Sequence, residues 1–206
     1  MRIEVEIRGK IDDFEDTLKR FQGKANFIEE KDRISFIYFR EGKDPEDVDS
    51  IREDPVDLKL RVTNKSAEMV MKYGRWGVEE SRKEFLFPFE LEKFGSALEF
   101  FKHLNWSRGV LMDTKTYLFE YKGVEFALVK SGETVYFEAE ILVNNPNEVK
   151  DAIEKIKKIC IEVNLEIFEE GEFIEMMNNL NKRKDRIFDM QKENFKDIKD
   201  KFEEFF

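Results

Sequence analysis

Charged and apolar residues alternate along several short segments of the chain. The first segment, residues 3–8, reads Ile-Glu-Val-Glu-Ile-Arg, and the same alternation recurs in residues 58–62, 82–87 and 135–141. Successive side chains of a β-strand point to opposite faces, so each strand would have one apolar face and one charged face. If the strands close into a barrel with helices outside, the charged faces meet in its lumen. A lumen that holds both signs of charge suits a metal ion together with a polyanion.

The remaining pattern predicts strands mixed with a few helices. Strands are expected over residues 2–10, 34–39, 57–63, 67–73, 79–87, 110–121, 123–130 and 134–143. Apolar residues at helical spacing predict helices over 90–104 and 148–160, and Asp12 or Asp13 is expected to cap a short helix that ends near Gly23. Short strands separated by turn residues are typical of an antiparallel meander. The Pro-containing, acidic segment 41–56 is expected to be a loop.

The last part of the chain is expected to be helical from about residue 172. Phe188, Phe195, Phe202 and Phe205 recur there at coiled-coil-like intervals among charged residues. A helix folded back on the barrel is favoured over a dimer contact, because the stripe is too short to establish a coiled coil. A homodimer through this stripe stays open as an alternative. The prediction is a barrel domain over residues 1–180 and a C-terminal helical extension over residues 181–206.

Composition narrows the classes of function. Of 206 residues, 36 are Lys or Arg and 46 are Asp or Glu, which gives a net charge of −10 and argues against nonspecific binding to nucleic acid or to a membrane surface. A small anionic ligand is still compatible, since a pocket can oppose the overall charge. One Cys and one His exclude an internal disulfide framework, a Ser-His-Asp triad and a His-rich zinc site. Without a visible signal peptide or long apolar segment, a cytoplasmic protein is expected.

The charged strands, taken in order, resemble those of the CYTH family. This family comprises class IV adenylyl cyclases, thiamine triphosphatases and inorganic triphosphatases, also called triphosphate tunnel enzymes. Its first strand carries Glu-x-Glu-x-Lys, and Glu4, Glu6 and Arg8 hold those places here. Further matches are the basic pair Lys59 and Arg61, the lysine Lys72, the Arg-x-Glu strand with Arg82 and Glu84, and the late Glu-x-Glu with Glu138 and Glu140. The match covers about residues 1 to 180.

This resemblance implies an α+β fold, a closed or nearly closed antiparallel eight-stranded β-barrel with outer helices. It implies that Mg²⁺ or Mn²⁺ binds to Glu4, Glu6, Glu84, Glu138 and Glu140. It also implies that a triphosphate-containing small molecule binds to Arg8, Lys59, Arg61, Lys72, Arg82 and Lys115, and that Glu4, Glu6 and Arg8 are the catalytic residues. Physical chemistry agrees, because hard divalent cations prefer carboxylate oxygens and Arg and Lys neutralise phosphate.

The sequence departs from the family pattern in several places. Val129 stands where an Asp is expected before the last Glu-x-Glu, so a metal ligand is missing unless Glu125 or Glu133 replaces it. Arg8 replaces a Lys and cannot act as a general base, because a guanidinium does not deprotonate in proteins. Leu86 replaces the second acid of the Arg-x-Glu-x-Glu pattern. Lys115 represents the basic residue expected before the seventh strand.

Three functions are compatible with these residues. The favoured one is metal-dependent hydrolysis of inorganic triphosphate, thiamine triphosphate or a nucleoside triphosphate, and a class IV-type adenylyl cyclase is a less favoured variant. The second is a degenerate protein that binds a polyphosphate or nucleotide without turnover, and the third uses the scaffold for protein contacts only. Trp76 and Trp106 could stack on a base or thiazole ring, although an ordinary core or surface role is favoured. Phe85, Phe87, Phe126 and Phe137 are expected to pack under the outer helices.

Overall fold

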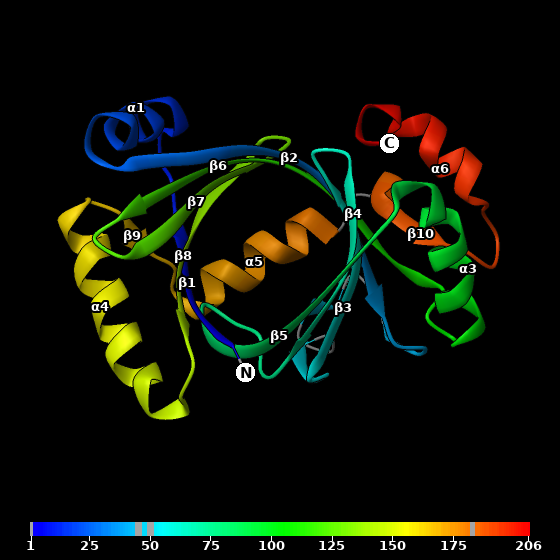
Figure 1. Ribbon diagram of the computed structural model, residues 1–206, viewed down its shortest axis with the longest axis horizontal. Helices are drawn as coiled ribbons and strands as arrows, with labels where there is room; N and C mark the ends of the chain where they lie inside the picture. Colours follow the sequence, from blue (N-terminus) through cyan, green and yellow to red (C-terminus); the bar gives the residue numbers. More distant parts are fainter. Residues whose placement is uncertain (1, 44–46, 49–51, 182–183) are drawn as a thin grey trace.

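The fold is a closed barrel of eight antiparallel strands, seen in a computed structural model that describes residues 2–43, 47–48, 52–181 and 184–206 (Figure 1). The barrel strands are β1 (Ile3–Lys10), β2 (Asn26–Phe39), β3 (Val56–Thr63), β4 (Ser66–Tyr73), β5 (Glu79–Phe89), β6 (Arg108–Tyr121), β7 (Val124–Ser131) and β8 (Thr134–Val143). Their order around the barrel is β6-β2-β3-β4-β5-β1-β8-β7, and pairing of β7 with β6 closes it. The predicted antiparallel eight-stranded barrel is confirmed.

Helices surround this barrel. They are α1 (Phe14–Lys24), α3 (Phe94–His103), α4 (Val149–Glu162), α5 (Glu170–Asn181) and α6 (Phe195–Lys201), with 3₁₀ turns at Leu91–Lys93, Pro146–Glu148, Lys184–Arg186 and Glu203–Phe205. Asp13 caps α1, because its side chain accepts a hydrogen bond from the backbone N–H of Asp16. The short strands β9 (Glu166–Ile167) and β10 (Ile187–Asp189) pair with β1 and β6. No helix in these described ranges is long and apolar enough to cross a membrane.

The apolar core lies outside the barrel, between its strands and the helices. Helices α1 and α4 cover one side, and α3 and α6 cover the opposite side (Figure 1). The first side buries Val5 and Phe126 against Phe21 and Ile156, and the second is centred on Phe94. Since the apolar faces of the strands turn outward to these helices, their other faces turn inward. The core therefore accounts for a lumen lined by charge.

Helix α5 has a different position from the other helices. In Figure 1 it crosses the ring of strands, and its buried Phe173 lies over the guanidinium of Arg8 inside the barrel. Ion pairs from Glu172 to Lys10 and from Glu170 to Arg52 hold its first turn against the barrel. Helix α5 thus covers one end of the tunnel.

The structure differs from the predicted elements in three places. Strand β2 begins at Asn26 rather than at residue 34, and its first part pairs with β6. This part was not predicted, because the charged run at residues 29–32 shows no alternation of charged and apolar residues. The segment after residue 184 includes strand β10 besides helix α6, rather than helix alone. Phe126 and Phe137 are buried as expected, but Phe87 is 56% exposed, so that prediction was wrong. Phe87 pairs with Met69 on the outer face of β4 and β5.

Candidate active site in the barrel lumen

Strand register places the charged faces of the barrel strands in one lumen. Residues directly opposite each other in an antiparallel pair share a face of the sheet. Glu6 lies opposite Glu140 on β8 and opposite Glu80 on β5, and Lys72 lies opposite both Glu84 and Asp57. Continuing these pairs around the barrel places on the lumen face charged residues that include Glu4, Glu6, Arg8, Glu29, Lys31, Arg33, Asp57, Lys59, Arg61, Glu68, Lys72, Glu80, Arg82, Glu84, Glu125, Glu138 and Glu140.

The structure brings together all but one of the residues that the sequence singled out. The lumen contains Glu4, Glu6, Arg8, Lys59, Arg61, Lys72, Arg82, Glu84, Glu138 and Glu140. Lys115 is the exception and its prediction was wrong. Its Nζ lies 2.6 Å from Glu30 Oε1 on the outside of the barrel, and its register partners are Asp32 and Lys130. The error is one residue of register, because the neighbouring Thr114 and Thr116 occupy the lumen positions of β6.

A cluster of buried carboxylates forms the acidic part of the lumen. One oxygen each of Glu4, Glu6 and Glu80 lies within 4.8 Å of the others. Burial and the neighbouring Glu4 carboxylate raise the pKa of Glu140 to about 9, and burial raises the pKa of Glu6 despite the adjacent Arg8. Burial favours the protonated form of Glu6 and Glu140, and a bound cation would favour their ionised form. The all-oxygen donor set and its need for positive charge fit Mg²⁺ or Mn²⁺.

Lys72 lies beside this carboxylate cluster. Its ammonium group contacts the Glu4 carboxylate, and its Nζ is 3.6 Å from Glu6 Oε2 and 4.0 Å from Glu84 Oε1. Burial lowers the pKa of Lys72, but Glu6 and Glu4 raise it by more, so the pKa lies above its usual value. Lys72 is therefore a buried cation at the edge of the carboxylate cluster.

Arg8 is surrounded by three carboxylates. Its Nη2 lies 2.5 Å from Glu6 Oε1, its Nη1 3.0 Å from Glu80 Oε2 and its Nε 3.3 Å from Glu138 Oε1. The Nη1 also donates to the carbonyl oxygen of Gly77 at 2.6 Å. This saturation fixes the guanidinium and keeps it charged, but the same carboxylates compete with any phosphate for it.

Glu80 connects Arg8 to Arg82, and the sequence reasoning missed it. Arg82 Nη2 lies 2.5 Å from Glu80 Oε1, while Arg8 contacts the other oxygen of the same carboxylate. Burial alone would raise the pKa of Glu80, but the charges of Arg8 and Arg82 lower it by more, to about 2. Glu80 is thus ionised at neutral pH and bridges two of the expected phosphate-binding cations.

A second group of cations lies along β2 and β3. Lys59 Nζ and Arg82 Nη1 lie 3.0 and 2.8 Å from Asp57 Oδ2, and Arg61 Nε lies 2.7 Å from Glu68 Oε1. Arg33 Nε donates to Thr63 Oγ1 at 2.9 Å, and no carboxylate of the described residues lies within 4 Å of its guanidinium. Burial and the neighbouring Arg61 lower the pKa of Arg33 to about 10. Arg33 is therefore a lumen cation that an anionic ligand can neutralise.

Among the lumen residues without a predicted role, Glu80 and Asp57 follow the same alternation as the residues that were expected there. Glu80 precedes Arg82 by two positions, and Asp57 precedes Lys59 by two. Extending the period-two pattern to both ends of each strand would have found these two. Arg33 lies in the part of β2 that was not predicted to be a strand, so no periodic signal pointed to it.

The position of the missing acid on β7 is also clear. Val129 faces the lumen and lies opposite Tyr136 and Thr116. Of its two candidate replacements, Glu133 is exposed in the β7–β8 turn, whereas Glu125 faces the lumen opposite Glu140. Leu86 also occupies a lumen position, opposite Val70, and is 47% exposed. Only Glu125 is placed to add a carboxylate to the cluster.

Comparison with known proteins identifies the fold. No protein-family model and no curated protein sequence matches the chain. Among solved structures, the PH1012 protein from Pyrococcus horikoshii OT3 is 18% identical, with a TM-score of 0.65 over 84% of this chain and 98% of that one. An adenylate cyclase candidate from Vibrio parahaemolyticus is 12% identical, with a TM-score of 0.64 over 81% and 93%.

A third structure comes from a protein with a described activity. HpAC1 from Hippeastrum, an adenylyl cyclase candidate with a dominant triphosphatase activity, is 14% identical, with a TM-score of 0.52 over 82% of this chain and 91% of that one. At these identities the likeness concerns the fold, and it agrees with the closed barrel. The chain therefore has the tunnel fold of the CYTH proteins.

Proposed function

We propose that this chain is a divalent-cation-dependent triphosphatase that works in the barrel lumen. One observation carries the proposal: carboxylates from β1, β5 and β8 and cations from β3, β4 and β5 face the same barrel lumen. A triphosphate is a polyanion that needs several cations, and a hard metal ion needs several carboxylates. The triphosphatase activity described for HpAC1 supports the same assignment.

The residues divide into two roles under this proposal. Glu4, Glu6, Glu138 and Glu140, together with Glu84 or Glu80, would hold Mg²⁺ or Mn²⁺. When bound, the metal ion would neutralise phosphate charge and activate a water molecule. Arg8, Lys59, Arg61, Lys72 and Arg82 would bind and orient the phosphates. Arg8 stays protonated, so its contribution is electrostatic stabilisation of the transition state rather than proton abstraction.

Phosphate release tests this proposal directly. We expect the protein to release phosphate from tripolyphosphate, ATP or thiamine triphosphate when Mg²⁺ or Mn²⁺ is present, and Glu6→Gln and Glu138→Gln to abolish the release. Glu166→Gln is the matched control, because Glu166 lies on β9 outside the barrel and pairs with Lys10. Turnover that survives both lumen substitutions would reject the assigned site.

A non-catalytic polyphosphate-binding protein is the second candidate. Two observations favour it: β7 carries Val129 in place of an acid, and Arg8 is held by three carboxylates. This function predicts that tripolyphosphate raises the melting temperature without release of product, and that Arg61→Ala weakens the effect. Formation of cyclic AMP and pyrophosphate from ATP would instead identify a cyclase, and no response to any polyphosphate would favour a role in protein contacts alone.

A further inference from the structure

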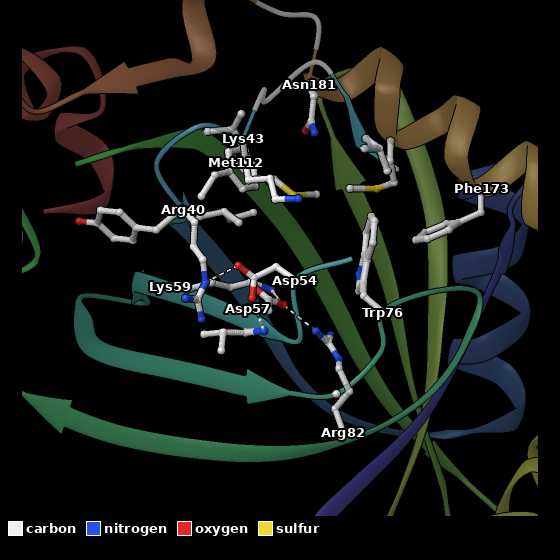
Figure 2. A pocket seen from close by; sticks show the side chains of 18 of the residues that line it. Arg40, Lys43, Asp54, Asp57, Lys59, Trp76, Arg82, Met112, Phe173 and Asn181 are labelled. Atoms are coloured by element: carbon white, nitrogen blue, oxygen red, sulfur yellow. Dashed lines mark hydrogen bonds and ion pairs between the residues drawn. The ribbon is translucent and has the colours of Figure 1, made fainter. Parts of the chain in front are cut away.

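A pocket of mixed character lies where the charged lumen meets helix α5 (Figure 2). Its cavity volume is about 120 Å³, within about 950 Å³ of space that includes open solvent. The lumen cations Arg8, Lys59 and Arg82 line it together with the acids that pair with them and with the apolar side chains of Trp76, Met112 and Phe173. This mixed lining suits a ligand that combines an anionic group with an apolar one.

Trp76 presents one ring face to this pocket. It lies in the loop between β4 and β5 and packs against Phe173 of α5, with ring centroids 5.0 Å apart and planes at 58°. Phe173 is fully buried. In Figure 2, Phe173 lies on one side of the indole and the pocket on the other. The protein thus fixes one face of the indole and leaves the second face for a ligand.

The lumen wall formed by β2 and β6 extends the apolar side of the pocket. Ile37 lies opposite Val110, and Met112 follows on the same face of β6. All three line the pocket, and none can bind phosphate. Inorganic triphosphate is charged along its whole length and would leave this wall without a partner. A planar ring would cover the wall and stack on the indole.

The loop that carries Trp76 is tied to the charged site. Arg8 Nη1 donates to the carbonyl oxygen of Gly77 at 2.6 Å, and the N–H of Gly77 donates to Glu80 Oε2 at 3.3 Å. These bonds hold the residue after Trp76 against the Arg8–Glu80 pair. The ring-binding surface and the phosphate-binding cations are therefore fixed relative to each other, so one ligand can contact both.

We propose that this pocket binds the planar ring of an organic triphosphate by stacking on Trp76, with the phosphates among Arg8, Lys59 and Arg82. This inference rests on the proposed function and names its substrate class. The preferred ligand is a triphosphate ester of a ring-bearing compound, and inorganic triphosphate occupies only the charged side.

Binding affinities of three probes test the inference. Dissociation constants for ATP, thiamine triphosphate and tripolyphosphate, each with Mg²⁺, are compared in the wild type and in Trp76→Leu. Because stacking on an aromatic side chain accounts for roughly tenfold or more in affinity, we expect Trp76→Leu to weaken at least one ring-bearing probe about tenfold and tripolyphosphate less than twofold. Trp106→Leu is the matched control, because Trp106 contacts Arg40 and does not line the pocket.

Tryptophan fluorescence gives a second measurement that does not depend on how well Trp76→Leu folds. The sequence contains two tryptophans, so Trp106→Phe leaves Trp76 as the only one. We expect the ring-bearing probe that binds to change the emission of Trp76, and tripolyphosphate to leave it nearly unchanged.

The outcomes separate this inference from the proposed function. Binding of tripolyphosphate as tight as that of both ring-bearing probes, with no selective effect of Trp76→Leu, would overturn the ring site and leave the triphosphate site standing. Failure of all three probes to bind the wild type would reject the proposed function, and the ring site with it.

Discussion

Glu80 illustrates how one buried carboxylate organises the charges around it. Its oxygens contact both Arg8 and Arg82, and its side chain is 1% exposed. Each arginine also contacts a second acid, Glu6 for Arg8 and Asp57 for Arg82. A buried ion pair is stable only when its groups are mutually satisfied, and removal of one partner leaves an uncompensated charge. Glu80 therefore positions two cations that the triphosphate would meet.

Substitution Glu80→Gln should destabilise the fold by about 3 kcal/mol at pH 7, because it leaves two buried guanidinium groups without that partner. The pKa of Glu80 is lowered to about 2, so its stabilising contribution is present above the usual carboxyl pKa of 4.5 and is lost as pH falls toward 2. The difference in unfolding free energy between wild type and variant should therefore shrink with acidification. Denaturant unfolding at pH 7 and at pH 3 measures it.

Glu79→Gln is the matched control for that prediction. Glu79 is the preceding residue on β5, but it is exposed and pairs with Lys157 outside the barrel. We expect a change below about 1 kcal/mol, as for other surface ion pairs. Equal effects of the two substitutions would show that Glu80 does not hold the two arginines in place.

At the scale of single residues, the sequence predicted which side chains face the lumen wherever alternation was visible. Glu4 and Glu6 were expected there because their strand has a clear period of two, and Lys72 was expected from the resemblance to the CYTH family. Lys115 was assigned incorrectly, because β6 has small polar residues at its lumen positions and a one-residue shift exchanges the two faces. The ion pairs of Glu80 could not be predicted, since they depend on three-dimensional contacts between β1 and β5.

Among the secondary-structure elements, helix α5 has the most direct effect on the site. Its Phe173 is fully buried among Arg8, Trp76 and Phe168, so it closes the lumen and supports the wall of the mixed pocket. The helix also makes ion pairs such as Lys10–Glu172 and buries Asn181. Phe173 is its largest fully buried side chain, so we expect the docking of α5 to depend strongly on this residue.

Phe173→Ala should destabilise the protein by about 3–5 kcal/mol, the usual cost of truncating a buried Phe. Phe100→Ala on α3 is the matched control, because Phe100 is 57% exposed and its loss should cost less than about 1 kcal/mol. Urea unfolding of both variants measures the difference. A cost for Phe173→Ala as small as that for Phe100→Ala would contradict the docking of α5 by this residue.

Element prediction succeeded where a segment had one clear period and failed where periods were mixed. The amphipathic helix near residues 90–104 and the strand near 2–10 were predicted within a few residues of α3 and β1. The first half of β2 was missed, because its charges pair along a ribbon with β6 and face solvent on both sides. The C-terminal segment folds back as favoured. The rings of Phe195 and Phe206 pack against Phe94 of α3, so the aromatic stripe covers one side of the barrel.

On the scale of the whole molecule, the fold separates its apolar and charged residues by a single layer of strands. The two apolar clusters lie outside under the helices, and the paired acids and bases lie inside. This arrangement explains how a chain with a net charge of −10 can present cations to an anion: they are concentrated in the lumen, where burial shields them from the acidic exterior. The barrel was expected from the resemblance of the charged strands to those of the CYTH family, but the covering of one end by α5 was not.

Two lysines provide the most direct test of the claim that the lumen binds a triphosphate. Lys72 lies inside the barrel beside Glu4, and Lys115 lies outside beside Glu30. The dissociation constant of tripolyphosphate with Mg²⁺ is measured by calorimetry for the wild type, Lys72→Met and Lys115→Met. The account predicts that Lys72→Met weakens binding at least tenfold, as expected for loss of a charge-assisted contact, and that Lys115→Met changes it less than twofold. Unchanged binding in Lys72→Met, or an equal loss in both variants, would contradict it.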